Sequence, residues 1–315
     1  MSDGASRTAG ADDGGETGIV VRHLRREIEV LPVAGGGAVR CFLRAAVPPV
    51  VTGDRVRLAR AAEDPGRGVI LALLPRTRLL ARHTARGLRP VCANLDLLLV
   101  TLAPAPAPHA DLLDRYLLAA ALDDLEVLVV VNKADALDAA AAAELEALLA
   151  PRRGLGIPVL EVSARSGAGL EALRDRLRGR TAAFVGQSGV GKSSLLNALV
   201  PDAAAETGEL SARRNRGRGR GRHTTSNTRL YRTGESVLVD SPGIREFAPA
   251  VPDAATLAAG FPEIAAAAAH CRFRDCHHGE EPDCGVRAAL AAGDVDASRL
   301  ASFRLLRETL LAPPR

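Results

Sequence analysis

The sequence predicts a chain of three folded parts: a small β-barrel, an α/β domain with a mostly parallel sheet, and a helical domain that holds a metal. Short apolar runs broken by glycine fill residues 18–82, and strand-like runs alternate with helical patterns over residues 83–250. Cysteines and histidines gather in residues 251–315. Because the spacing of apolar residues changes between these ranges, each range predicts its own core. A length of 315 residues is enough for two or three cores.

The start of the chain and its composition argue for a protein that works away from membranes. Residues 1–17 are mostly Gly, Ala, Ser, Asp and Thr, so they predict a disordered tail and neither a signal peptide nor an anchor. No apolar run reaches membrane-spanning length, and an odd number of cysteines suits a reducing compartment. We therefore expect a soluble, cytoplasmic monomer, whose net charge of +4 permits an anionic partner.

Residues 18–82 predict a barrel of the OB-fold type. Several of the runs alternate apolar with polar residues, as half-buried strands do, and Gly35–Gly37 predicts a hairpin turn. The expected strands cover residues 19–21, 28–30, 39–43, 55–58 and 69–71. Small barrels of this kind bind nucleic acid in some proteins and only hold domains together in others, so both interpretations stay open.

Residues 83–250 predict alternating strands and helices, hence a parallel sheet with helices on both faces. The expected strands cover residues 95–102, 127–131, 159–162, 182–185 and 237–239, and the expected helices cover residues 112–122, 139–149, 170–177 and 194–199. The alternating Ala-Pro stretch at 103–108 stands between a strand and a helix of this domain, and it predicts a stiff surface loop.

A phosphate-binding loop follows the strand at 182–185. Residues 186–193 read G-x4-G-K-S, and a helix follows them. Glycines let backbone N–H groups turn toward an anion, and the helix start adds further donors. Lys192 would place its charge on the outer phosphates, and Ser193 would offer a hydroxyl to Mg²⁺. The predicted phosphate-site residues are Gly186, Gln187, Ser188, Gly189, Val190, Gly191, Lys192, Ser193 and Ser194.

Two further stretches predict selection of guanine. Residues 132–135 read Asn-Lys-Ala-Asp at the carboxyl end of a buried strand, where open α/β sheets bind ligands. The Asp135 carboxylate can accept two hydrogen bonds from the guanine edge, which adenine cannot donate. The only two lysines of the chain are Lys133 and Lys192, one in each motif. The predicted base-site residues are Asn132, Lys133, Ala134 and Asp135, with the backbone of Ser163 and Ala164.

The remaining parts of a GTP site lie downstream. Residues 240–243 read Asp-Ser-Pro-Gly, so that Asp240 would hold Mg²⁺ through water and the Gly243 N–H would sense the γ-phosphate. Thr224 and Thr225 lie where a switch threonine belongs. Thr225 is assigned to Mg²⁺ with Ser193 and Asp240, although the sequence leaves open which of the two threonines binds the metal. Ordinary GTPases place the guanine motifs after these elements, whereas here they come first. This order indicates a circularly permuted GTPase domain, a rearrangement that preserves the folded site.

The chain resembles the ribosome small-subunit-dependent GTPase A family (RsgA, also called YjeQ) over residues 18–310. Besides the permuted GTPase motifs and the cysteine cluster, the matching stretches are residues 53–56 (Gly-Asp-Arg-Val), 94–96 (Asn-Leu-Asp), 114–117 (Asp-Arg-Tyr-Leu) and 221–225 (Gly-Arg-His-Thr-Thr). The resemblance implies an N-terminal OB-fold barrel, a central circularly permuted P-loop GTPase and a C-terminal α-helical zinc domain. It also implies a role in late maturation of the small (30S) ribosomal subunit through its 16S rRNA, with hydrolysis of GTP to GDP stimulated by that subunit.

The cysteine cluster predicts one structural zinc. Three thiols and an imidazole lie within residues 271–284, a donor set that favours a closed tetrahedral site. The family pattern Cys-x-His selects His278 over His277 and His270, so the assigned ligands are Cys271, Cys276, His278 and Cys284. The alternative is a set of free, buried cysteines. Helices are expected at residues 263–269, 286–290 and 298–311, and the last carries Arg299, Arg304 and Arg307 toward either RNA or solvent.

His223 is the candidate catalytic residue. Many GTPases place a water-orienting glutamine after D-x-x-G, but this chain has Ile244 there. His223 precedes the switch threonines and can accept or donate a proton near neutral pH, although it could instead pack against the barrel or contact RNA. Before it lies a departure from the family pattern, an arginine-glycine run at residues 213–222, which favours RNA contact over a solvated loop. We expect slow intrinsic hydrolysis that the small subunit stimulates.

Two rival functions remain open from the sequence. One is a passive RNA-binding or RNA-remodelling protein in which GTP only sets affinity. The other is a permuted GTPase of large-subunit assembly, against which the barrel and the Cys/His cluster argue.

Overall fold

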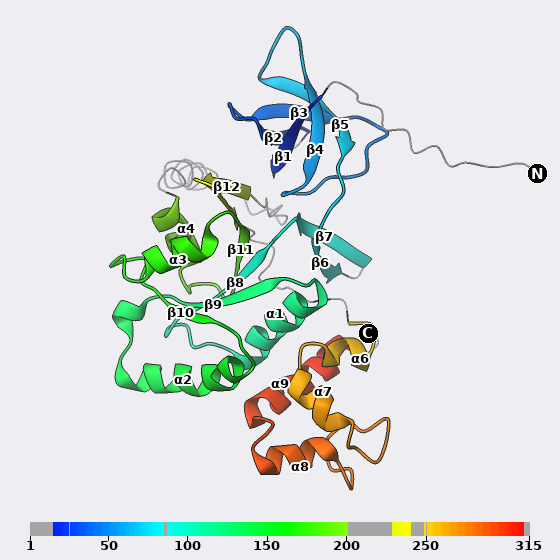
Figure 1. Cartoon of the computed structure of the whole chain (residues 1–315), viewed down its shortest axis with the longest axis vertical. Coiled ribbons are helices and arrows are strands. Elements are labelled where there is room, and N and C mark those ends of the chain that lie inside the picture. Colours follow the sequence, from blue (N-terminus) through cyan, green and yellow to red (C-terminus); the bar gives the residue numbers. More distant parts are fainter. Residues whose placement is uncertain are drawn as a thin grey trace, which may run out of the picture.

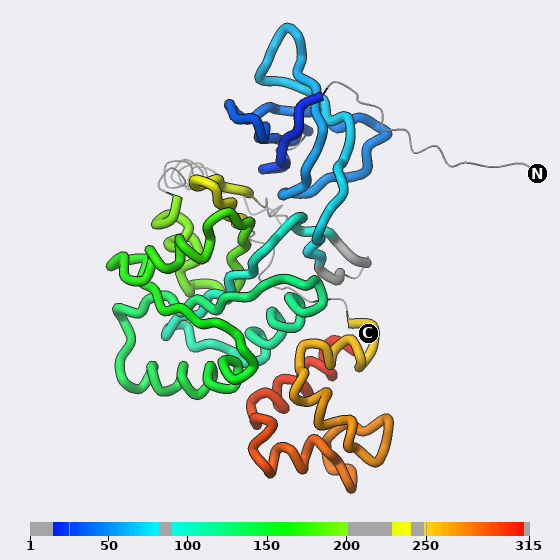
Figure 2. The backbone as a smooth tube through the Cα atoms, in the orientation of Figure 1, coloured from blue at the N-terminus to red at the C-terminus, as the bar shows by residue number. Residues whose placement is uncertain are grey.

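The computed structural model describes residues 15–24, 26–84, 87–200, 229–240, 249 and 251–311, with the backbone alone at residues 82–89. A barrel lies at one end of the molecule, an α/β layer structure at the centre and a group of helices at the other end (Figure 1). The tube in Figure 2 shows that these three parts follow one another along the chain. No described helix is both long and apolar enough to cross a membrane.

The N-terminal barrel is closed by five strands and confirms the predicted barrel. The strands are β1 (Glu16–His23), β2 (Ile28–Pro32), β3 (Val39–Leu43), β4 (Arg55–Arg60) and β5 (Arg67–Leu73). Their order is β1-β2-β3-β5-β4, and β4 pairs back with β1. Every pair is antiparallel except β3 with β5. The inward side chains form a compact apolar core that includes Val20, Val30, Cys41, Val56, Leu58 and Ile70.

A two-stranded hairpin that the sequence did not predict joins the barrel to the central sheet. It consists of β6 (Leu79–Thr84) and β7 (Gly87–Ala93), which pair antiparallel. Pro90 in β7 argued against a strand, since proline removes a ladder donor and is confined to edge positions. A two-stranded sheet supplies such an edge. The boundary predicted between residues 82 and 83 falls inside β6.

The hairpin and barrel meet in a barrel joint, formed by Gly53, Asp54, Arg76, Ala93 and Asn94. The Asn94 amide donates to the carbonyl of Gly53 (2.9 Å) and accepts from the N–H of Thr77 (2.8 Å). The Ala93 N–H donates to the carbonyl of Thr52 (3.0 Å). The buried Asp54 carboxylate pairs with the Arg76 guanidinium at 2.7 and 2.8 Å. Backbone contacts from two family stretches therefore fix the barrel on the GTPase part.

The central sheet has the predicted parallel arrangement, with one unpredicted antiparallel strand. Its parallel strands are β8 (Leu97–Leu102), β9 (Glu126–Val131), β10 (Val159–Glu161), β11 (Thr181–Val185) and β13 (Ser236–Asp240). The unpredicted strand is β12 (Arg229–Thr233), which pairs with β13 and meets β1 of the barrel at one residue pair. The order is β10-β9-β8-β11-β13-β12. The chain runs outward from β8 to β10 and then returns to β11, so the strand order reverses between β8 and β11.

Helices cover both faces of this sheet as predicted. They are α1 (Ala110–Leu122), α2 (Ala139–Gly154), α3 (Leu170–Leu177) and α4 (Lys192–Leu199), with a short 3₁₀ turn η1 (Ala134–Ala136) after β9. One apolar core lies between the sheet and α1 with α2. The second lies between the sheet and α3 with α4. The two cores position the described loops after β8, β9, β10 and β11 at the carboxyl edge of the sheet, where ligands of open α/β folds bind.

The C-terminal part is helical, as predicted. It contains α6 (Ala254–Ala258), α7 (Pro262–Ala268), α8 (Gly285–Ala292) and α9 (Ala297–Leu310), of which α6 was not predicted because it is only five residues long. Their apolar core includes Leu257, Phe261, Ile264, Val286, Leu300 and Phe303. Leu118 of α1 joins this core, so the C-terminal helices pack directly on the GTPase part.

Candidate nucleotide-binding site and metal centre

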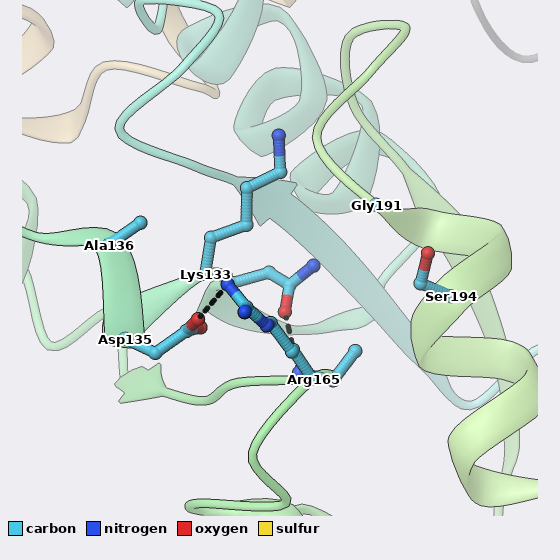
Figure 3. Close-up of a pocket in the computed structure, with 8 residues that line it drawn as sticks. Lys133, Asp135, Ala136, Arg165, Gly191 and Ser194 are labelled. Atoms are coloured by element: carbon cyan, nitrogen blue, oxygen red, sulfur yellow. Dashed lines mark hydrogen bonds and ion pairs between the residues drawn. The ribbon is translucent and has the colours of Figure 1, made fainter.

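The predicted phosphate and guanine motifs meet at the carboxyl edge of the sheet. The phosphate loop follows β11, residues 132–135 follow β9, and Ser163 follows β10. Between them lies a pocket of about 480 Å³, within the size range of small-molecule sites. In Figure 3, Gly191 and Ser194 face Lys133 and Asp135 across this pocket. Its lining residues are Asn132, Lys133, Asp135, Ala136, Ala164, Arg165, Gly191 and Ser194.

The phosphate loop has a backbone that requires glycine at its close contacts. Gly191 has a φ of +94°, and a Cβ there would lie 2.3 Å from the side-chain nitrogen of Asn132. Helix α4 begins at the next residue, so its first N–H groups point toward the loop. The Lys192 ammonium donates to the carbonyls of Gly186 (2.7 Å) and Gln187 (2.5 Å). The lysine charge therefore lies within the curve of the loop, where an anion would bind.

Asn132 connects the phosphate loop to the turn after β10. Its side chain is almost fully buried, donates to the carbonyl of Val190 (2.9 Å) and accepts from the N–H of Ala164 (3.1 Å). One amide thus uses both its donor and its acceptor to hold two loops at a fixed separation. Since the Ser163 N–H donates to the carbonyl of Ala168, both backbone N–H groups predicted for the base have partners inside the protein.

Lys133 makes a second connection around the pocket. It has the left-handed φ of +64°, which is uncommon for a residue with a side chain. Its ammonium donates to the carbonyls of Ala105 and Gly189, both at 2.7 Å. Ala105 belongs to the predicted Ala-Pro loop, which indeed connects β8 to α1. The lysine therefore joins three segments: the turn after β9, the loop before α1 and the phosphate loop.

Asp135 is oriented toward the pocket by two neighbours. Its carboxylate accepts from the Ser163 hydroxyl at 2.5 Å and lies 3.9 Å from the Arg165 guanidinium. The carboxylate remains partly accessible, as a group that reads a base edge must be. Sequence reasoning missed Arg165, whose only signal was its position directly after Ser163-Ala164.

The Mg²⁺ side of the predicted site is described in part. Asp240 ends β13 and lies in register with Phe184 of β11, so it stands beside the strand that leads into the phosphate loop. Ser193 lies in the first turn of α4. His223, Thr224, Thr225, Gly243 and the arginine-glycine run at 213–222 lie outside the described residues.

The four predicted metal ligands converge. The donor atoms of Cys271, Cys276, His278 and Cys284 all lie within 4.8 Å of one another. The Cys271 and Cys284 sulfurs are 3.8 Å apart, and each lies 3.6 Å from Nδ1 of His278. Sulfurs bound at ~2.3 Å in a tetrahedral zinc site would be about 3.8 Å apart. Burial lowers the pKa of His278, which favours the neutral imidazole. These residues could hold a metal ion, whereas a scattered set of free cysteines does not fit this geometry.

The three arginines of α9 make contacts within the protein, and for the buried Arg299 this corrects the expectation of a side chain that faces RNA or solvent. Arg299 is 1% exposed, so it neither touches RNA nor forms a solvated face. Arg304 donates to the carbonyl of His278, and Arg307 donates to the carbonyl of Cys276 (3.4 Å). The helical pattern of the sequence predicts that these side chains face solvent. It carries no information on the segment with the metal ligands, residues 271–284, which packs against α9.

Comparison with known proteins agrees with this geometry. The model of a family described as RsgA GTPase matches residues 73–249. A "Small ribosomal subunit biogenesis GTPase RsgA" of Azotobacter vinelandii is 46% identical over 310 residues, which cover 96% of this chain and 89% of the relative. A protein of the same name from Pseudomonas fluorescens is 46% identical over 307 residues, covering 96% and 88% of the two chains.

Two solved structures share the fold. YjeQ from Thermotoga maritima superposes with a TM-score of 0.73 at 29% identity, covering 95% of this chain and 99% of that chain. YloQ, described as a circularly permuted GTPase, superposes with a TM-score of 0.69 at 24% identity and covers 98% and 100% of the two chains. The likeness extends over the barrel, the central sheet and the C-terminal helices.

Proposed function

Because the chain belongs to the RsgA GTPase family, as its motifs predicted, we propose that it is a GTPase of small ribosomal subunit biogenesis. It binds the 30S subunit and its 16S rRNA in the GTP state, acts in late maturation and leaves after hydrolysis. It works as a cytoplasmic monomer. The names and near full-length identity of the relatives support this proposal.

The observation that carries the nucleotide assignment is the convergence of separate motifs on one pocket. Asn132 and Lys133 both hydrogen-bond to the phosphate loop, and Asp135 faces the same pocket. GTP would lie with its phosphates in the loop at residues 186–193 and its base against Asp135. The proposed set is the one named from the sequence, extended by Arg165.

The two metals that the proposal requires suit the residues present. Mg²⁺ prefers oxygen ligands and retains water, and Ser193 and Asp240 offer oxygens on the two segments next to the phosphates, with Thr225 as the third. Bound Mg²⁺ would neutralise charge on the phosphates. At the C-terminal centre, three sulfurs and one imidazole favour Zn²⁺ and leave no open position. That site is structural.

His223 is proposed to position the attacking water once the small subunit orders the segment before it. The proposal rests on the sequence alone: Ile244 replaces the usual glutamine, and the arginine-glycine run precedes His223. Hydrolysis by the free protein should then be slow.

The decisive experiment measures GTP hydrolysis by the full chain alone, with purified 30S subunits and with 50S subunits. We expect strong stimulation by 30S only. The variant His223→Ala should keep GTP affinity and 30S binding but lose roughly 10²-fold in stimulated turnover, the scale of a positioned catalytic group. Stimulation by 50S instead would favour large-subunit assembly, and 30S binding without stimulation would favour a passive RNA-binding protein.

Base selection supplies a separate test of the pocket. Asp135→Asn should weaken GTP by about 2–3 kcal/mol, because the amide cannot accept two guanine hydrogen bonds, and should improve xanthosine triphosphate. Glu146→Gln neutralises an exposed carboxylate that does not line the pocket and should leave the base preference unchanged. Equal affinity of the Asp135 variant for GTP would remove residues 132–135 from the site.

A further inference from the structure

Helix α1 lies between the central sheet and the C-terminal helices (Figure 1). The loop before it, residues 103–109, contacts the phosphate loop. The Lys133 ammonium joins the carbonyl of Ala105 to that of Gly189. A Cβ on Gly189 would lie 3.5 Å from the ring of Pro106, so the two loops touch. A displacement of the phosphate loop would therefore also displace the start of α1.

A side chain within α1 makes a second contact with the phosphate loop. Tyr116 is 1% exposed; burial raises the pKa of its hydroxyl, and the backbone of Gly186 lies near enough to oppose that shift. Gly186 is the first glycine of the loop and has no room for a Cβ, which would lie 2.2 Å from the carbonyl of Thr101. The start of the loop thus packs tightly on β8 and lies close to Tyr116 of α1.

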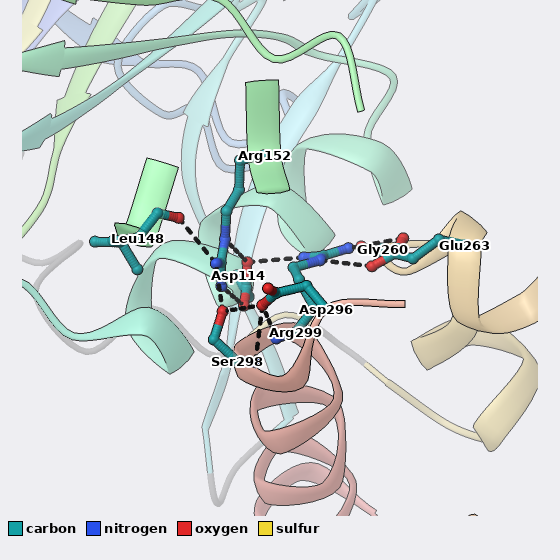
Figure 4. Close-up of polar contacts among 8 residues, drawn as sticks. All are labelled: Asp114, Leu148, Arg152, Gly260, Glu263, Asp296, Ser298 and Arg299. Atoms are coloured by element: carbon teal, nitrogen blue, oxygen red, sulfur yellow. Dashed lines mark hydrogen bonds and ion pairs between the residues drawn. The ribbon is translucent and has the colours of Figure 1, made fainter. Parts of the chain in front are cut away.

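The other side of α1 carries the contact with the C-terminal helices. Asp114 and Tyr116 are two positions apart and so project from different sides of the helix. The buried Asp114 carboxylate accepts from Arg152 of α2 at 2.5 and 3.1 Å and from Arg299 of α9 at 2.7 Å. Figure 4 shows both guanidinium groups directed at this one carboxylate. Leu118, one turn later, belongs to the C-terminal apolar core.

Arg299 is in turn fixed inside the C-terminal part. Its guanidinium donates to the Glu263 carboxylate at 2.6 and 3.2 Å and to the carbonyl of Gly260 at 2.9 Å. It also lies 4.2 Å from the centre of the Phe261 ring. Because these contacts and the bond to Asp114 hold the guanidinium at all three nitrogens, the position of α9 determines where Asp114 is held.

We infer that α1 couples the C-terminal domain to the phosphate loop, with Arg299 and Tyr116 as positioning residues at its two sides. The inference rests on the proposed nucleotide site. Arg299 holds α1 where Tyr116 supports Gly186, so contact with Arg299 raises nucleotide affinity. Linkage is reciprocal, so bound nucleotide must also stabilise the contact between α1 and α9. This route is separate from the covalent one through residues 241–250.

The first test compares two glutamine variants of the same ion network in the full, zinc-loaded chain. Arg299→Gln removes the contact between domains; Asp114 keeps Arg152 as a partner, whereas Glu263 loses its ion partner, an effect that the second variant reproduces by itself. Glu263→Gln removes a charge of the same network but leaves Arg299 on Asp114. We expect fluorescent GDP to bind about tenfold more weakly to Arg299→Gln, within the usual range of coupling between sites. Glu263→Gln should bind within twofold of the unaltered chain.

The second test asks whether the two positioning residues act together. Tyr116→Phe should also weaken GDP, and the double variant with Arg299→Gln should be no weaker than the weaker single variant, because both interrupt one path. Losses that multiply would overturn the inference. So would a folded Arg299→Gln protein that binds GDP as the unaltered chain does, or a Glu263→Gln protein that is equally weakened.

Hydrogen exchange of the unaltered chain decides the inference even if Arg299→Gln does not fold. GDP should slow amide exchange in the first turns of α9 and in α7, and Arg299→Gln should abolish that protection where it folds. Exchange in these helices that GDP leaves unchanged would overturn the coupling. If the unaltered chain binds no guanine nucleotide, the proposed function fails as well, so the two failures are distinguished.

Discussion

The two joints that hold the GTPase part to its neighbours are built from different interactions. The barrel joint combines backbone groups and short contacts around Gly53 and Asn94 with one ion pair, between Asp54 and the partly exposed Arg76. The C-terminal joint depends on buried ions, with Asp114, Arg152 and Arg299 contributed by three helices. Backbone contacts fix a geometry that side-chain substitutions change little. In a buried ion pair, loss of one partner leaves a buried charge uncompensated, which is strongly destabilising. The barrel joint should therefore tolerate loss of Arg76, which is 23% exposed, better than the C-terminal joint tolerates loss of Arg299, which is 1% exposed.

Removal of the metal should give the largest difference between the two joints, because it should unfold one side of the C-terminal joint alone. Cys276 and Cys284 belong to the C-terminal apolar core, and zinc supplies folding energy on the order of 10 kcal/mol or more at such sites. Cys276→Ser or chelation should therefore unfold residues 251–311 and leave the barrel joint intact. Proteolysis and hydrogen exchange of the two regions would show this. Cys41→Ser in the barrel core is the control, and metal analysis that finds no zinc would contradict the assignment.

Asp114→Ala should break the C-terminal joint with the metal still bound. It leaves two arginine side chains, each at most 1% exposed, without their shared carboxylate, and such a loss costs about 3–5 kcal/mol. Chemical denaturation would measure the change in unfolding free energy. Glu146→Ala removes the exposed partner of Arg153 and should cost less than about 1 kcal/mol. Similar effects of the two variants would show that Asp114 is not held in a buried network.

Gly53→Ala should damage the barrel joint by a smaller amount. Its φ is +89°, and a Cβ would lie 2.2 Å from the carbonyl of Ala93. Backbone strain and overpacking together should cost roughly 2–4 kcal/mol. Gly35 has a φ of +100° with open space around it, so Gly35→Ala should show only the strain, about 1–2 kcal/mol. Equal losses at the two glycines would mean that the barrel moves to accept the methyl group.

Acidification should weaken the barrel slightly through His23. Burial lowers the pKa of this imidazole below 6.5, although Asp54 and a hydrogen bond with the backbone of Val50 oppose the shift. Near pH 6.5 the unfolded chain therefore binds a proton that the folded barrel does not bind. The free energy of unfolding is highest above that pH and decreases as the pH falls toward the pKa of the folded state. Between pH 7.5 and 5.5, His23→Gln should lose less Tm than the unaltered chain. Parallel declines would remove His23 as a cause.

The sequence predicted the features that are coded by residues close together in the chain, and it did not predict contacts between residues far apart in the chain. The phosphate loop, the Asn132–Asp135 turn and the metal ligands are coded by short spacings, so each could be placed before the fold was known. Arg299 and Asp114 are 185 positions apart, and no local pattern marks them as partners. Strands with clear alternation were predicted, whereas β7 contains Pro90 and β12 has no counterpart in the expected βα alternation.

The single residue pair between β1 and β12, Arg22 with Arg229, has a consequence for dividing the molecule. It places the barrel against the last strand of the GTPase sheet and makes one continuous sheet of both. A version of the chain that begins after residue 73 would lose this pair and expose the outer backbone groups of β12 at Arg229. Open strand edges can recruit other strands. The barrel therefore shortens the open edge of the GTPase sheet at its last strand.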